Sequence, residues 1–299
     1  MTNPDTSYPI GSPGQPWGDA ERAQWLAGQR KQRSHANDVL SAIDRLRDRF
    51  DVVEYGRLDY AGETYPLLAL KSRDWRDDLP VALVTGGVHG ALRFAERDAA
   101  DYAGRVNLLI VPCVSPWGYE RIHRWNMHAI DPNRSFRDDS PAEEAAALIR
   151  LVAPLQGRFL LHIDLHETTD SDESEFRPAL AARDGKPYEP GEIPDGFYTV
   201  GDSVNPQLPF QQAVIDAVAK VTHIAPADAR GEIIGSAVVS PGVILYPVKS
   251  LGLCAGVTDA TYVTTTEVYP DSPRTTADEC NAAQAAAVRG ALDHALAAG

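Results

Sequence analysis

Four short runs of almost uninterrupted apolar residues stand out along the chain, and segments of helical periodicity separate them. The runs lie at 81–85, 106–111, 159–165 and 262–268. A strand that is buried on both faces of a parallel sheet has this pattern, whereas a strand with one solvated face alternates. The four runs therefore predict the buried centre of a mostly parallel sheet.

Helical periodicity and one hairpin signal complete the predicted elements. The stretch 51–70 alternates around Ala61-Gly62, which predicts two strands joined by a turn. The helical segments lie at 19–49, 91–103, 141–153, 209–222 and 274–297.

The predicted organisation is a single α/β domain, because strands alternate with helices and no linker divides the sequence. Residues 1–17 are expected to form an irregular arm before a domain that spans 18–299. The polar stretch 170–201 is rich in Pro and Gly and predicts a long loop. Loops of that length are usually functional or disordered.

Composition and charge indicate which binding partners and which cellular compartment to expect. The 299 residues include 42 acidic and 28 basic side chains, for a formal net charge of −14. That charge repels nucleic acid and anionic membranes, so we expect neither as a partner. No apolar run is long enough to span a bilayer, and residues 1–17 lack the apolar core of a signal peptide. We therefore expect a cytoplasmic protein.

Three widely separated cysteines, Cys113, Cys254 and Cys280, do not predict a disulfide framework. Cys254 lies within Gly-Leu-Cys-Ala-Gly, which copies the spacing of a nucleophile elbow with a thiol in place of the hydroxyl. The surrounding stretch is apolar and glycine-rich, so we interpret Cys254 as buried packing rather than as a nucleophile.

Ionisable side chains stand at the carboxyl ends of three predicted strands, the edge where ligands bind in open α/β sheets. His89 follows the first run, His166 the third, and Glu267 lies near the end of the last. Neutral imidazole is a good zinc ligand, and a nearby carboxylate can take a proton from metal-bound water. Together these residues predict a hydrolytic zinc centre, although a single histidine at a strand end more often has a structural role.

The segment Asp131-Pro132-Asn133-Arg134 carries a different chemistry. A neutral amide beside a guanidinium fork can hold a carboxylate at two points. Arg124, a few residues earlier, adds a second guanidinium. We therefore expect a peptide or a small carboxylate-bearing substrate. A salt bridge within a surface turn is the alternative interpretation.

In this order and combination, these residues resemble the zinc metallocarboxypeptidase family of the carboxypeptidase A type, over about residues 81–270. The resemblance implies a mixed sheet of about eight strands between helices, with 18–299 as the catalytic domain. It implies that His89 and His166 bind zinc. It also implies that Asp131 orients a ligand histidine, as carboxylates beside metal sites commonly do.

The resemblance also implies roles around the substrate. Asn133 and Arg134 would hold the terminal carboxylate, and Arg124 would polarise the scissile carbonyl. Glu267 would act as the general base. Tyr246 is a candidate for the tyrosine that covers the substrate, and a half-buried strand residue is an equal alternative.

One position departs from the family pattern His-x-x-Glu, in which the glutamate is the third zinc ligand. Leu92 stands at that position here. The next carboxylate, Glu96, lies about 7 Å further along a helix that starts near Ala91. The connector from His89 to Gly104 has only 16 residues, near the minimum for a parallel crossover. We hypothesise that a short segment carrying the glutamate is absent from this chain.

The principal functional prediction is a zinc-dependent exopeptidase that removes a C-terminal residue. One alternative is a zinc-dependent deacylase of N-acyl amino acids. A second alternative is a binding module that grips C-terminal carboxylates without cutting them, because the third zinc ligand is missing. The sequence does not indicate an oligomeric state.

Overall fold

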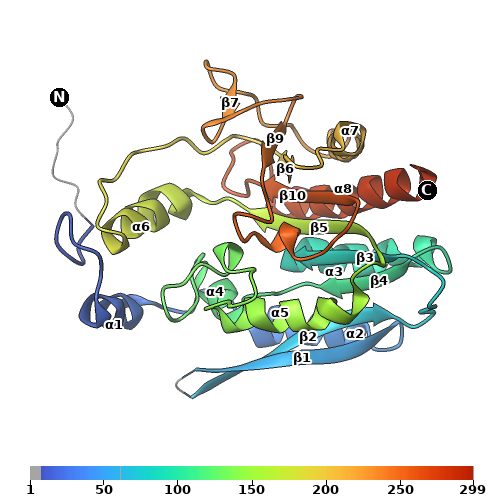
Figure 1. The fold of residues 1–299 in the computed structure, drawn as a ribbon, viewed down its shortest axis with the longest axis horizontal. Coiled ribbons are helices and arrows are strands. Elements are labelled where there is room, and N and C mark those ends of the chain that lie inside the picture. Colours follow the sequence, from blue (N-terminus) through green and yellow to red (C-terminus); the bar gives the residue numbers. More distant parts are fainter. Residues whose placement is uncertain (1–7, 61, 299) are drawn as a thin grey trace.

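A mixed sheet of eight strands forms the centre of the computed structural model, which describes residues 8–60 and 62–298 (Figure 1). The strand order is β1-β2-β4-β3-β5-β10-β6-β9, and four of the seven neighbouring pairs are parallel. This confirms the predicted α/β fold with a mostly parallel sheet. The strands are β1 Phe50–Tyr60, β2 Glu63–Ser72, β3 Val81–Gly86, β4 Asn107–Val111, β5 Phe159–Glu167, β6 Tyr198–Asp202, β9 Val243–Tyr246 and β10 Tyr262–Val268, with a separate hairpin of β7 Glu232–Ile233 and β8 Ser236–Ala237.

The four apolar runs form β3, β4, β5 and β10. On β3 and β4, successive side chains alternate between two hydrophobic clusters. On β3, Val81 and Leu83 belong to one cluster, and Ala82 and Val84 belong to the other. Successive side chains of a strand point to opposite faces of the sheet. Both faces are covered here, which explains why the runs are continuous rather than alternating.

Helices cover both faces of the sheet (Figure 1). One face packs against α5, and the other packs against α3, α7 and α8. Within the described ranges, no helix is long and apolar enough to cross a membrane. The helices are α1 Asp19–Gly28, α2 Ser41–Arg45, α3 Val88–Arg97, α4 Pro116–Arg121, α5 Glu143–Val152, α6 Arg177–Arg183, α7 Leu208–Val218 and α8 Ala277–Ala298.

The helix predicted over 19–49 is interrupted, so that prediction is wrong in part. The first helix, α1, ends at Gly28, and a π-helical turn resumes the helical path only shortly before α2. Between them, the N–H groups of Gln32 and Arg33 donate to the carbonyl of Glu120 at 2.7 and 3.0 Å. These bonds lead to α4 instead of to carbonyls four residues earlier. The segment between α1 and α2 therefore packs on α4 instead of continuing the helix.

The loop predicted over 170–201 also contains regular structure, because α6 and β6 lie within it. This polar stretch contains three buried aromatic side chains, Phe176, Phe197 and Tyr198. Phe176 packs into an aromatic cluster. The same cluster anchors α1 and the last residue of the predicted arm. Residues 1–7 of that arm lie outside the described part of the chain. The aromatic cluster consists of Trp17, Trp25, Trp117, Trp125 and Phe176.

The junction between β3 and α3 depends on Gly87, which has a φ of 59°. A Cβ atom at this position would lie 2.4 Å from Cβ of Leu165 on β5. The close approach brings the start of α3 directly against the strand that carries His166.

Gly87→Ala should lower the free energy of unfolding by about 2–3 kcal/mol, because strain at positive φ adds to the displacement of Leu165. Gly104→Ala is the matched control, since Gly104 has a φ of 70° and no neighbouring atom within 4 Å. The free energy of unfolding of this control variant should fall by only about 1 kcal/mol. Urea unfolding of both variants measures the difference, and equal losses would contradict the proposed close contact.

Candidate functional site

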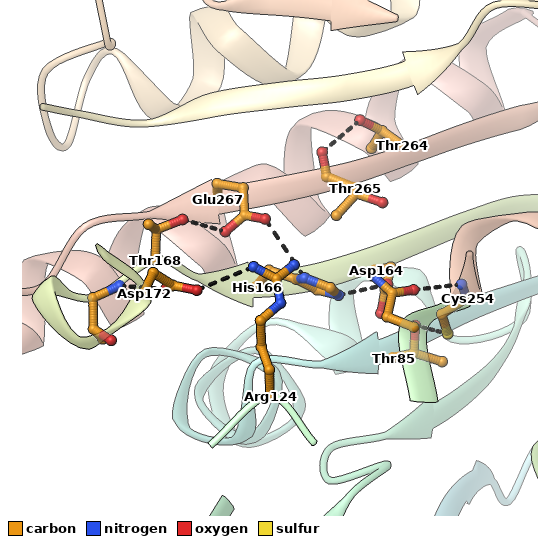
Figure 2. A network of polar contacts seen from close by, with 12 residues as sticks. Thr85, Arg124, Asp164, His166, Thr168, Asp172, Cys254, Thr264, Thr265 and Glu267 are labelled. Carbon is orange, nitrogen blue, oxygen red and sulfur yellow. Dashed lines mark hydrogen bonds and ion pairs between the residues drawn. The ribbon is translucent and has the colours of Figure 1, made fainter. Parts of the chain in front are cut away.

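His166 and Glu267 lie opposite each other at the carboxyl ends of two neighbouring parallel strands (Figure 2). The histidine is the penultimate residue of β5, the glutamate is the penultimate residue of β10, and the two are register partners. Nδ1 of His166 is 3.5 Å from Oε1 of Glu267. The hydroxyl of Thr168 donates to Oε2 of Glu267 at 3.0 Å. Backbone pairing thus places the imidazole against the carboxylate.

The other ring nitrogen of His166 contacts a carboxylate that the sequence analysis did not single out. Nε2 of His166 is 2.7 Å from Oδ2 of Asp164, and Thr85 donates to Oδ1 of Asp164 at 2.7 Å. Residues two apart on a strand share one face of the sheet. An Asp-x-His pair within a predicted strand was therefore the signal that could have found Asp164.

His166 is held as an imidazolium between these two carboxylates. Burial by itself lowers the pKa of His166, but Asp164 and Glu267 outweigh it and raise the pKa to about 10. For Asp164, burial raises the pKa, whereas the attraction of His166 and the Thr85 hydrogen bond bring it below its ordinary value. At neutral pH the ring is therefore positively charged and compensated on two sides.

A buried polar chain supports Asp164 from behind. Because the Thr85 hydroxyl donates to Asp164, Nε2 of His162, 3.0 Å from that hydroxyl, must be the donor to it. Burial lowers the pKa of His162 to about 4 and keeps this ring neutral. The Cys254 thiol is 3.5 Å from the same hydroxyl, and burial raises its pKa well above the ordinary value. A thiolate nucleophile is therefore disfavoured at this position.

Arg124 reaches the site from the loop after α4. Its Nη1 is 3.1 Å from Oδ1 of Asp172, and its guanidinium lies 4.8 Å from the centre of the Phe176 ring. Asp172 in turn accepts the N–H of Thr169 at 3.0 Å. Two residues from the stretch that was predicted to be a loop therefore hold Arg124 in place. No motif in the sequence singles out either residue.

Asn133 and Arg134 lie in a short helical turn beside the same space. Oδ1 of Asn133 accepts the N–H of Cys254 at 2.7 Å, which leaves the amide NH₂ as a donor. Arg134 has no carboxylate within 4.0 Å among the described residues. Burial and the repulsion of Arg124 lower the pKa of Arg134, although Asp131 acts in the opposite direction.

Asp131 does not contact a histidine in the described part of the chain. Its Oδ1 accepts the N–H of Asn133 at 2.9 Å, so it caps the turn that carries the amide and the guanidinium. The bond expected from Asp131 to a ring nitrogen is made by Asp164 instead. Asp131 acts on the site through the position of Asn133.

No hydrogen bond or ring contact joins His89 to His166 in the described part of the chain. His89 lies exposed in the first turn of α3, with Nε2 3.1 Å from the Tyr119 hydroxyl, which donates to Asp38. Its neighbours Val88 and Ala91 are buried against the core. Because α3 starts directly after β3, its apolar face takes the inward positions and the imidazole is turned outward.

Neither residue discussed for the third zinc ligand reaches the site. Leu92 is 4% exposed and packs in the hydrophobic core. Glu96 lies on the far part of α3, where its carboxylate is 3.5 Å from Arg45.

Two joined cavities open at this edge of the sheet. The smaller, of about 230 Å³, and the larger, of about 670 Å³, share six lining residues. A third cavity of about 600 Å³ meets both at Arg124 and Asp172. Tyr246 lines the larger cavity, whereas His89 lines none of the three. The residues shared by the first two cavities are Arg124, Asp131, Asn133, His166, Asp172 and Glu267.

The eight-stranded sheet, with this cleft at the carboxyl ends of its central strands, defines a fold of the metallocarboxypeptidase type. The structure is similar to a candidate metallopeptidase of Shewanella amazonensis SB2B, with a TM-score of 0.61 and 20% identity over 92% of this chain and 93% of that chain. A candidate metallopeptidase of Shewanella denitrificans OS217 gives a TM-score of 0.61 and 18% identity over 85% and 88% of the two chains.

A metallo-carboxypeptidase from Burkholderia cenocepacia has the same fold, with a TM-score of 0.55 and 18% identity over 93% of this chain and 70% of that chain. No family model and no curated protein matches the sequence. At these identities the likeness shows the fold. The names of these neighbours imply a metal cofactor in them, so the residues of this chain must be tested against one.

The residues of this chain do not fit a zinc ion with three protein ligands, the usual number at a catalytic zinc. Across residues 8–60 and 62–298, no group of three or more His, Cys, Asp or Glu side chains could hold a metal ion. His166 has a carboxylate at each ring nitrogen, and His89 faces Tyr119. His166 is thus the single predicted ligand at the cleft.

Zinc titrated into the metal-free protein should bind weakly, and His89→Ala should leave that affinity unchanged, because His89 is exposed and its Nε2 faces Tyr119. His166→Ala is the comparison variant for the cleft. Calorimetry and elemental analysis of the dialysed protein measure both effects. Tight one-to-one binding of zinc that disappears in each of the two variants would show that the rings share an ion.

Proposed function

We propose that the cleft binds the carboxylate of a peptide C-terminus or of an N-acyl amino acid. The observation that carries this proposal is the Arg134 guanidinium, which has no carboxylate partner among the described residues and lies beside Arg124 and the amide of Asn133. Two guanidinium groups that repel each other next to a donor amide are stabilised by an anion between them.

The pairing of the other charges supports the same ligand. The carboxylate of Asp131 accepts a backbone N–H, and that of Glu267 accepts a hydroxyl and faces His166. Neither carboxylate is within 4.0 Å of Arg134. Nη1 of Arg134 donates to the carbonyl of Asn133 at 2.7 Å. The other N–H groups of the guanidinium remain available for a ligand, and a carboxylate can accept two of them.

The comparisons support a substrate of this kind, because the Burkholderia cenocepacia neighbour is a metallo-carboxypeptidase. A peptide and an N-acyl amino acid both end in an α-carboxylate, so the same residues serve either ligand. With a net charge of −14, we propose neither nucleic acid nor an anionic membrane as a partner.

The acetylated dipeptide N-acetyl-Ala-Leu should bind, and its C-terminal amide should bind at least about tenfold more weakly, because hydrogen bonds to a charged group are lost. Arg134→Gln should abolish this difference. Arg150→Gln removes the same charge from an exposed position of α5 and should preserve it. Calorimetry in the presence of a chelator measures both ligands on the unaltered protein and on the two variants, and equal affinity of acid and amide for the unaltered protein would refute the proposal.

A second candidate function is zinc-dependent removal of the C-terminal residue, with Glu267 as general base. It is favoured by the position of Glu267, which shares both cavities with Arg124 and His166 at the carboxyl ends of the central strands. The arrangement of ligands argues against it, since His166 alone of the predicted ligands lies at the cleft. We therefore propose recognition without efficient cleavage.

Incubation with acyl dipeptides and added zinc should release no C-terminal amino acid above background. If chelator-sensitive release is seen, the second candidate is correct, and Glu267→Gln should then lower the rate by about 100-fold or more while metal content stays constant. Glu96→Gln is the matched control, because Glu96 lies away from the cleft and pairs with Arg45. Quantitative amino-acid analysis provides the readout.

A further inference from the structure

The wall of the larger cavity is rich in guanidinium groups, although the protein as a whole is strongly acidic. Six arginines line this cavity of about 670 Å³. They come from α1, from α6 and from the segment between α4 and α5. In a chain with a net charge of −14, such a concentration is a local reversal of charge. The six are Arg22, Arg124, Arg134, Arg137, Arg177 and Arg183.

Four of these guanidinium groups have a carboxylate partner. The pairs are Arg124–Asp172 at 3.1 Å, Arg137–Asp139 at 3.3 Å, Arg177–Glu173 at 2.8 Å and Arg183–Asp184 at 2.8 Å. Among the described residues, Arg22 and Arg134 have no carboxylate within 4.0 Å. Two guanidinium groups of the cavity therefore lack a carboxylate in direct contact, although Asp131 and Glu267 act on Arg134 from a greater distance. An α-carboxylate satisfies one of the two.

Arg22 is placed by its surroundings rather than left free in solvent. It lies half-buried on α1, which Trp25 fastens into the aromatic cluster, and its Nη1 donates to the carbonyl of His128 at 3.1 Å. One carbonyl uses one of the five N–H donors of a guanidinium. The remaining donors and the full positive charge stay available to a ligand in the cavity.

A cationic ligand side chain is disfavoured in the same space. The carboxylates that line the cavity are already engaged: Asp172 and Asp184 with arginines, Asp131 with a backbone N–H, and Glu267 with Thr168. Among these four carboxylates of the described residues, Asp131 alone has no cationic partner within 4.0 Å. A lysine side chain would therefore find at most one free carboxylate and would meet several guanidinium groups.

We propose that the ligand carries a second carboxylate, as a peptide or N-acyl amino acid that ends in glutamate does. Arg134 and Asn133 bind the α-carboxylate of the ligand, and Arg22 binds the carboxylate of the glutamate side chain. This inference rests on the proposed function and names the class of ligand that the same cleft selects. Arg22 is the residue that determines the specificity.

The test is calorimetric titration with N-acetyl-Ala-Glu, N-acetyl-Ala-Gln and N-acetyl-Ala-Lys in the presence of a chelator. The Glu peptide should bind about tenfold or more tightly than the Gln peptide, which differs only in the charge of the side chain. The Lys peptide should bind most weakly. Arg22→Gln should reduce the Glu-over-Gln preference to about onefold, and Arg22→Lys should restore part of it.

Arg150→Gln is the matched control, since it changes the net charge equally from outside the three cavities. If the Glu and Gln peptides bind with equal affinity, the inference is overturned while the proposed function stands. If no peptide binds, the proposed function fails as well. A preference that survives in Arg22→Gln would overturn the assignment of Arg22. Thermal unfolding of each variant verifies that α1 stays docked.

Discussion

The parallel pairing of β5 with β10 is the constraint on which the site depends. It sets His166 opposite Glu267 through backbone hydrogen bonds, and the two-residue period of β5 adds Asp164 on the other side of the ring. The positive charge of the imidazole is thus balanced by a carboxylate on each side, without any ligand. Because α8 donates from Gln284 to the backbone carbonyl of His166 at 2.9 Å, the strand end is also braced by the helical layer.

The short passage from β3 into α3 has the opposite effect on His89. The helix begins at Val88, and its buried residues recur on one face as Val88, Ala91, Leu92 and Ala95. A residue next to Val88 in sequence is rotated by about 100° around the axis, so it points away from that face. The hydrophobic effect holds the apolar face inward, and the imidazole is left on the outside beside Tyr119.

The protein therefore combines a fold of the metallocarboxypeptidase type with a cavity that six arginines line. Arg124 is oriented by Asp172 and by the ring of Phe176, while Asn133 is oriented by the N–H of Cys254. In each case a rigid partner satisfies one part of the side chain and leaves other donors directed to the cavity. Such preorganisation lowers the entropic cost of binding a carboxylate.

The sequence by itself determined the four buried strands, the α/β class and the chemical types at the carboxyl edge, because burial on both faces leaves continuous apolar runs that local inspection can find. It also pointed to Arg134 and Glu267 as residues of interest. Only the tertiary structure decided which of these groups meet. The break in the helix over 19–49 arises from bonds to Glu120, and α6 is held by Phe176 in a distant aromatic cluster. Both depend on partners far along the chain, so local periodicity could not reveal them. The direction in which His89 points depends likewise on how α3 packs.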